Sequence, residues 1–323
     1  LGADDGIGIA MEMALLKAND IEHGPIECVF TRDEETGLTG AFEMKPGFMT
    51  GDYLINLDSE DEGQLFVSCA GGVRTEATYT VDEEKLPEGF STFNLVVKGL
   101  TGGHSGDDIN KKRANANKLL VRFLWEQSEK TDLRLCDIQA GGLHNAIPRE
   151  AHATVAVPTA YVATFGEELQ AFVEKVRDEF SATEPELTAV IEPVAAAPTC
   201  ICKEQAERLL KSLSVVHNGI FAMSQDLEGL VETSSNLASV RKHGNQIVAT
   251  TSQRSSVASN LEYMASVVRS AFELGGAKCV TNEGYPGWKM NPKSEILKVC
   301  VDSYKRLFGK EPLVRAIHAG LEC

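Results

Sequence analysis

Two successive series of strand and helix patterns occupy the middle of the chain and constrain its fold more than any other feature. In the first series, strand-like alternation and helical periodicity follow one another in the order strand, helix, strand, strand, helix, strand. Its members are residues 93–99, 111–129, 134–139, 151–157, 165–180 and 188–193. This order is typical of a ferredoxin-like unit.

A comparable series follows the first, with little sequence identity to it, so the repeat is one of topology. Its members are a helix at 204–213, strands at 219–223, 234–241 and 246–251, a helix at 257–274 and a strand at 278–282. We therefore predict one large inserted α+β domain over residues 70–282, built of two ferredoxin-like halves.

The two flanking segments, 1–69 and 283–323, have the pattern of an α/β domain. The expected elements are a helix at 6–17, buried strands at 25–31 and 53–57, a short helix at 40–44 and a helix at 294–308. Because the α/β pattern returns after the insertion, we predict that the first domain is discontinuous and that the inserted domain interrupts it.

Charge and composition restrict the partners. The chain has 323 residues, of which 43% are hydrophobic and 24% charged, and a formal net charge of −16. This length suggests about two domains of a soluble protein. Such an acidic surface repels nucleic acid and anionic lipid, so we expect neither nucleic acid nor a membrane as a partner. The longest apolar runs also fall far short of the ~20 residues that a membrane span requires.

The cysteines indicate the compartment. Eight of them are scattered along the chain, mostly in apolar runs. This distribution is typical of free thiols in a reducing environment, so we expect a cytoplasmic protein. Cys200 and Cys202 form the closest pair, and no second pair or nearby histidine completes a zinc knuckle.

Acidic residues stand at the ends of three expected elements. Asp4 and Asp5 precede the first helix, Glu34 and Glu35 follow the first strand, and Asp58 ends the second strand. Taken alone, the first pair is better explained as a helix cap, and the second pair is better explained as solvated loop acids. An open α/β sheet, however, places its ligands at strand ends, and clustered carboxylates suit zinc, manganese or cobalt. The joint pattern therefore favours a hydrolase with two metal ions.

Six short motifs resemble those of the di-zinc exopeptidase family that includes carnosinases, peptidase T and carboxypeptidase G. They are Asp4-Asp-Gly, Asp33-Glu-Glu-Thr-Gly37, Leu57-Asp58, Gly102-Gly-His-Ser-Gly106, Asn145-Ala-Ile-Pro148 and His318-Ala-Gly-Leu-Glu322. The resemblance covers essentially the whole chain in order, and it is greatest to bacterial dipeptidases of the aminoacyl-histidine type. It implies a catalytic domain over 1–69 and 283–323 and a lid domain over 70–282.

The resemblance also implies roles in the catalytic domain. Asp4 would bridge two divalent metal ions, most simply zinc, with cobalt or manganese as alternatives. Glu35 would bind one ion and Asp58 the other. Glu34 would be the general base that takes a proton from the attacking water and returns it to the leaving amine. Gly320 would contact the peptide substrate through its backbone, and His318 is not assigned as a ligand.

Three lid residues receive roles from the same resemblance. His104 would stabilise the developing oxyanion. Asn145 and Arg254 would hold the substrate, with Arg254 facing a free C-terminal carboxylate. The implied partner is a small peptide, and lids of this family leave open a homodimer.

Two family motifs have no counterpart in the sequence. A His-x-Asp motif upstream of the bridging aspartate and a ligand histidine beyond the glycine-rich loop are both missing, so we expect a chain truncated at both ends that does not complete the di-metal site alone. Two alternatives to a metal-dependent dipeptidase remain open. One is a related tripeptidase or N-acyl amino acid deacylase, and the other is a non-catalytic binding protein on this fold.

Overall fold

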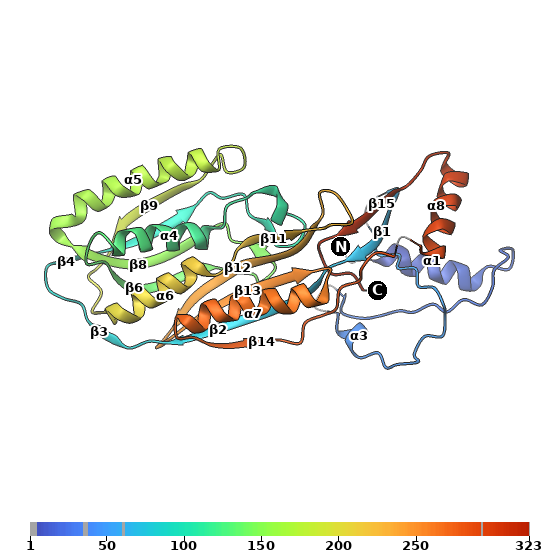
Figure 1. Cartoon of the computed structure of the whole chain (residues 1–323), viewed down its shortest axis with the longest axis horizontal. Helices are drawn as coiled ribbons and strands as arrows, with labels where there is room; N and C mark the ends of the chain where they lie inside the picture. Colours follow the sequence, from blue (N-terminus) through green and yellow to red (C-terminus); the bar gives the residue numbers. More distant parts are fainter. Residues whose placement is uncertain (1–4, 35–37, 60–61, 292, 323) are drawn as a thin grey trace. The chain divides into compact units, whose positions relative to one another are not determined.

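The computed structural model describes residues 5–34, 38–59, 62–291 and 293–322, and the chain divides into two compact units (Figure 1). The first unit comprises Leu1–Val67, Met290–Ala316 and Gly320–Cys323, and the second comprises Ser68–Lys289 and Ile317–Ala319. The domain limits that we inferred from the sequence, 69/70 and 282/283, stay a prediction.

The second unit is built on an antiparallel sheet that has nine strands among the described residues. In order across the sheet these are β14 (Lys278–Thr281), β2 (Gly71–Thr80), β13 (Gln246–Ser255), β12 (Val231–His243), β6 (Arg134–Gly141), β8 (Ala151–Pro158), β4 (Phe90–Lys98) and β9 (Thr188–Pro193), with β11 (Gly219–Met223) paired to β12. Two further pairs stand outside this sheet, β3 (Glu83–Lys85) with β10 (Thr199–Ile201), and β5 (Gly103–His104) with β7 (Ala146–Ile147).

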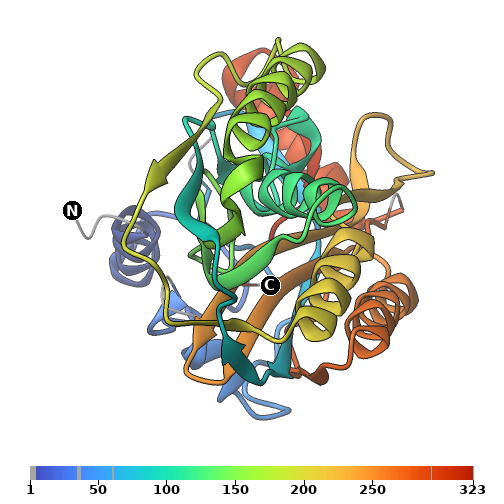
Figure 2. The same ribbon diagram turned by 90° about the vertical axis from the view of Figure 1, so that its left-hand side faces the viewer.

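Four helices cover one face of the sheet (Figures 1 and 2). They are α4 (Ala116–Ser128), α5 (Val162–Glu179), α6 (Lys203–Val215) and α7 (Ala258–Leu274). A single hydrophobic core fills the space between the layers, and Phe123, Phe165 and Phe272 are each at most 1% exposed within it. Each such side chain contributes about 1.5–3 kcal/mol, so this core fixes the domain.

The ferredoxin-like halves are confirmed. The first half runs β4-α4-β6-β8-α5-β9 and the second runs β2-α6-β12-β13-α7-β14, and the halves join where Val240 of β12 pairs with Ala140 of β6. The second half therefore begins with β2 and not with residues 219–223, which form the side strand β11. The reason is that β2 pairs with β13 over the full ladder from Thr80–Gln246 to Gly71–Ser255, a partnership that sequence order cannot reveal.

Helix α4 begins later than its periodicity predicts. We expected a helix from residue 111, but the side chain of Asn115 accepts hydrogen bonds from Asn117 N and Lys118 N and caps the helix there. The preceding residues Ile109–Lys111 form a 3₁₀ turn, η1. A capping side chain of this kind outweighs the propensity of the residues before it.

The first unit contains three helices in its described residues, α1 (Gly6–Lys17), α3 (Thr39–Phe42) and α8 (Glu295–Phe308), and a two-stranded sheet of β1 (Gln64–Cys69) and β15 (Leu313–Ile317). Asp5 caps α1, because its Oδ1 accepts a 2.9 Å hydrogen bond from Gly8 N. No helix in the described part of the chain is long and apolar enough to cross a membrane.

The buried strands that we expected at 25–31 and 53–57 are wrong for this structure. Both segments lack strand pairing, and Tyr53 and Ile55 are 57% and 60% exposed. The apolar composition of these runs favours a strand, but a strand forms only against a neighbour that takes up its backbone hydrogen bonds. None of the described residues supplies that neighbour.

Candidate active site

The predicted site residues of the first unit are described in part. Asp4 and Glu35 lie outside the described residues, whereas Glu34 and Asp58 lie within them. Glu34 follows Asp33, which has a left-handed φ of 58°. The carbonyl of Glu34 accepts a 3.2 Å hydrogen bond from Leu38 N.

Glu322 holds together the segments that carry these carboxylates. Its Oε2 accepts a 2.6 Å hydrogen bond from Thr31 Oγ1, just upstream of Glu34. Its carbonyl accepts a 2.9 Å hydrogen bond from Asn56 Nδ2, and Asn56 Oδ1 in turn accepts 2.7 Å from Asp58 N. The first unit therefore fastens the segments of Glu34 and Asp58 to the loop that contains Gly320.

Sequence reasoning gave Thr31, Asn56 and Glu322 no role. Glu322 stood inside a recognised motif, which was the signal that could have singled it out. Thr31 and Asn56 carried no such signal, because their importance depends on a partner near the other end of the chain.

The side chains of this unit include donors that suit a divalent metal ion. Glu34, Asp58 and Glu322 offer the oxygen donors that divalent cations take, and Oε1 of Glu322 is buried without a hydrogen-bond partner among the described residues. Still, no group of three or more His, Cys, Asp or Glu side chains in the described ranges lies close enough to hold an ion. The donor chemistry fits, but these residues alone do not complete a metal centre.

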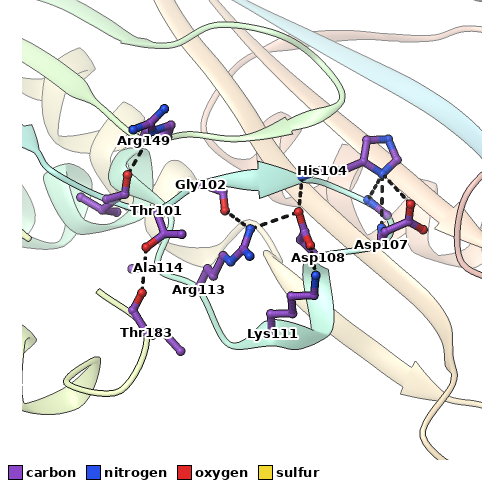
Figure 3. A network of polar contacts seen from close by, with 12 residues as sticks. Thr101, Gly102, His104, Asp107, Asp108, Lys111, Arg113, Ala114, Arg149 and Thr183 are labelled. Carbon is purple, nitrogen blue, oxygen red and sulfur yellow. Dashed lines mark hydrogen bonds and ion pairs between the residues drawn. The ribbon is translucent and has the colours of Figure 1, made fainter. Parts of the chain in front are cut away.

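His104 ends strand β5 of the second unit, paired with Ala146 of β7. Its Nδ1 accepts hydrogen bonds from the backbone N–H groups of Gly106 at 3.3 Å and Asp107 at 3.2 Å (Figure 3). The Asp107 carboxylate is 3.7 Å from Nδ1, too far for a hydrogen bond. Because Nδ1 accepts these hydrogen bonds, the proton of the neutral ring lies on Nε2. Nε2 is therefore the nitrogen that can donate to a substrate.

The charge state of His104 suits that role. Burial lowers the pKa of His104, and the positive charge of Arg254 lowers it further, although Asp107 and Asp108 oppose these effects. The imidazole is therefore neutral near pH 7, when it donates from Nε2 without carrying a charge of its own.

Asp108 braces the turn that presents His104 (Figure 3). Its Oδ2 accepts a 2.8 Å hydrogen bond from His104 N and lies 3.0 Å from Arg113 Nη1. Arg113 also donates to the carbonyl of Gly102, which begins the turn. Burial alone would raise the pKa of Asp108, but hydrogen bonds from Lys111 and His104 N lower it, so the Asp108 carboxylate is ionised.

Glu184 closes the same segment from the α5–β9 connection. The side chain is 1% exposed, and its Oε2 and Oε1 accept hydrogen bonds from Thr101 N at 2.6 Å and Ala114 N at 2.8 Å. Both ends of the 101–114 segment are thus fixed, and the position of His104 is determined before any ligand binds.

Arg254 lies on β13, only 6% exposed. Its Nη1 donates a 2.7 Å hydrogen bond to the hydroxyl of Tyr285, and its Nε is buried without a partner among the described residues. In the described ranges no carboxylate lies within ion-pair distance of this guanidinium. A buried cation without an anion is costly, so the site is suited to a carboxylate supplied by a ligand.

Asn145 is placed beside His104 by the backbone. Its carbonyl accepts a 2.8 Å hydrogen bond from Ser105 N, and its side chain is exposed. The structure thus brings together His104, Asn145 and Arg254 in the second unit, while Glu34, Asp58 and Gly320 lie in the first unit.

An α/β unit that carries acidic residues is interrupted by an α+β domain with a neutral histidine and a buried arginine that has no carboxylate partner among the described residues. This is the arrangement of a two-domain peptidase. Residues 88–187 match the family model of the peptidase dimerisation domain. Over 323 residues the chain is 39% identical to the cytosol non-specific dipeptidase of Escherichia coli, covering all of this chain and 67% of that protein. The chain belongs to the M20 peptidase family.

Solved structures agree with this assignment. The aminoacylhistidine dipeptidase of Vibrio alginolyticus superposes with a TM-score of 0.92 at 40% identity, over all of this chain and 66% of that one. The aminopeptidase PepT of Bacillus cereus matches with a TM-score of 0.50 at 16% identity, over all of this chain and 59% of that one, and shows the shared fold alone. The chain thus spans about two thirds of the length of its dipeptidase relatives.

Proposed function

We propose that the full-length protein is a dipeptidase that recognises the free C-terminal carboxylate of its substrate. The buried guanidinium of Arg254, which has no carboxylate partner among the described residues, carries this proposal. An enzyme that cleaves at the end of a peptide must distinguish that end from the chain interior, and a carboxylate is its distinguishing charge. The dipeptidase relatives support the same substrate class.

The other assignments extend this proposal. Glu34 is the general base towards the attacking water. His104 donates from Nε2 to the carbonyl oxygen as negative charge develops there. Asn145 and the backbone at Gly320 orient the peptide. Because the 101–114 segment is braced in advance, little reorganisation is needed when the substrate binds.

Asp4, Glu35 and Asp58 would hold two divalent ions, of which zinc suits mixed carboxylate and histidine ligands best. When bound, such a pair polarises a carbonyl and makes a water nucleophilic near neutral pH. The carboxylate chemistry of Glu34, Asp58 and Glu322 supports this assignment.

We also propose a cytoplasmic homodimer. The match of residues 88–187 to a dimerisation domain supports self-association, and the name of the E. coli relative supports the compartment. Sedimentation of the full-length protein tests the first statement.

A substrate panel tests the activity. The full-length protein would be assayed on Xaa-His and other dipeptides, on their C-terminal amides, on tripeptides and on N-acyl amino acids. The expected result is turnover of dipeptides and loss of turnover with the amides. Preference for tripeptides or N-acyl amino acids would assign a neighbouring activity, and no turnover of any of them would remove the enzyme assignment.

A further inference from the structure

His318 belongs to the second unit, although the residues on either side of the short stretch Ile317–Ala319 belong to the first. Its side chain is 5% exposed, and its Nε2 lies 2.7 Å from Ser234 Oγ. The next residue is held as well, because Ala319 O accepts a 3.0 Å hydrogen bond from Ala70 N. The stretch Ile317–Ala319 is therefore fastened to the second unit.

The backbone of His318 contacts the turn that carries His104. A Cβ placed on Gly106 would lie 2.4 Å from His318 O and 3.1 Å from His104 Cε1. Such a separation from a carbonyl oxygen is impossible without movement of the backbone. Only glycine at position 106 lets the turn lie directly against His318.

The ring of His318 is neutral in this position. Burial lowers the pKa of His318 to about 3, and the positive charge of Arg254 contributes to the shift. Ser234 is the register partner of Arg254 between β12 and β13. One histidine thus contacts both the turn of His104 and the strand position opposite Arg254.

We propose that His318 is a positioning residue that holds the His104 turn in its catalytic arrangement, through its hydrogen bond to Ser234 and the packing of its carbonyl on Gly106. The inference rests on the proposed function for the part that His104 plays. An apolar residue would fill the same space, but it would leave Ser234 Oγ buried without this partner. The histidine is therefore needed for its hydrogen bond to Ser234 as well as for its volume.

Kinetics of the full-length enzyme give the first test. Since misplacing a catalytic group costs rate more than binding, His318→Ala and Ser234→Ala should lower kcat about 10- to 100-fold and change KM less than about threefold. His318→Gln, whose amide nitrogen reaches the position of Nε2, should recover most of the rate. His152→Ala is the matched control, because His152 is a half-buried histidine of the same unit, on β8, and its removal should leave kcat unchanged.

A double-mutant cycle separates positioning from general damage. If His318 acts through His104, then adding His318→Ala to the His104→Ala variant should lower kcat by less than about a further threefold. Full additivity of the two losses, or a loss for His318→Gln as large as for His318→Ala, would overturn the proposal.

A second readout does not depend on activity. In NMR spectra of the imidazole nitrogens, the His104 shifts and its titration midpoint should change in Ser234→Ala and stay unchanged in His152→Ala. An unchanged His104 signal in Ser234→Ala would refute the positioning role. If the His104 shifts change in Ser234→Ala but the protein cleaves no dipeptide, the proposed function is refuted and the positioning role of His318 stands.

Discussion

Thr31 Oγ1 donates a 2.6 Å hydrogen bond to Oε2 of Glu322, a residue 291 positions further along the chain. The contact fastens the segment that leads into Glu34 to the loop that follows Gly320. Both residues are only half-buried, so the contact does not depend on the burial of apolar side chains. Its effect is to fix the direction of two loops whose backbones have no strand pairing of their own.

Thr31→Val keeps the shape of the side chain and removes the donor. Hydrogen bonds to charged groups contribute about 1.5–3 kcal/mol, and partial exposure reduces this to about 1–2 kcal/mol. We expect faster amide hydrogen exchange in the first unit. Both tryptophans, Trp125 and Trp288, belong to the second unit, so the fluorescence transition in urea should not move. A shifted fluorescence transition with unchanged exchange would contradict the prediction.

Glu34→Gln should lower kcat about 10²- to 10⁴-fold, because a glutamine cannot accept the proton of the attacking water. Metal content should stay at the wild-type level, since the role assigned to Glu34 is proton transfer. Elemental analysis and steady-state kinetics of the full-length protein measure both. Glu43→Gln is the control, because that exposed carboxylate lies in a surface ion pair of 3.5 Å with Arg32. Metal loss in Glu34→Gln would make Glu34 a ligand.

Arg254→Gln should raise KM for dipeptides with a smaller effect on kcat, since a substrate carboxylate is present in the ground state and the transition state alike. The same variant should lose the discrimination against C-terminal amides. Arg74→Gln is the matched control, because Arg74 is an exposed arginine on the neighbouring strand β2. If Arg254→Gln keeps its preference for the free carboxylate, that group is bound elsewhere.

His104→Ala should lower kcat about 10²- to 10³-fold with little change in KM, since negative charge on the carbonyl oxygen appears only in the transition state. The pKa of His104 is lowered by burial and then by Arg254. Its NMR titration midpoint should therefore lie below 6.5, and it should rise in Arg254→Gln, which removes a positive charge. A midpoint that stays in place would show that the two side chains do not interact.

His318 should make stability depend on acidic pH. Its pKa is near 6.5 in the unfolded chain and about 3 in the folded one. Below pH 6.5 the unfolded state therefore binds a proton that the folded state does not bind. Folding stability should fall as the pH drops from 6.5 towards 3. At pH 5 the loss should be about 2 kcal/mol. His318→Gln cannot titrate, so its urea midpoint should fall less between pH 7 and pH 5, and parallel profiles would exclude this linkage.

The lid domain was predictable because its signals are local. Helices α6 and α7 begin and end within about two residues of the positions that periodicity predicts. Each buries one apolar stripe, and a stripe is visible in the sequence itself. The motif around His104 was visible for a similar reason, since its glycines and Asp108 stand within a few residues of the histidine that they position.

The sequence by itself determined the order of the lid elements, the family motifs and the acidic loops, because each depends on neighbours close along the chain. Only the tertiary structure decided that 25–31 and 53–57 form no strands, because pairing needs a partner from elsewhere in the chain. It also decided that Arg254 is buried with no acid in ion-pair distance among the described residues, that Ser234 reaches His318 across 84 residues, and that Glu322 reaches Thr31 across 291. Burial and long-range hydrogen bonds arise from packing, and no local pattern of residues encodes them.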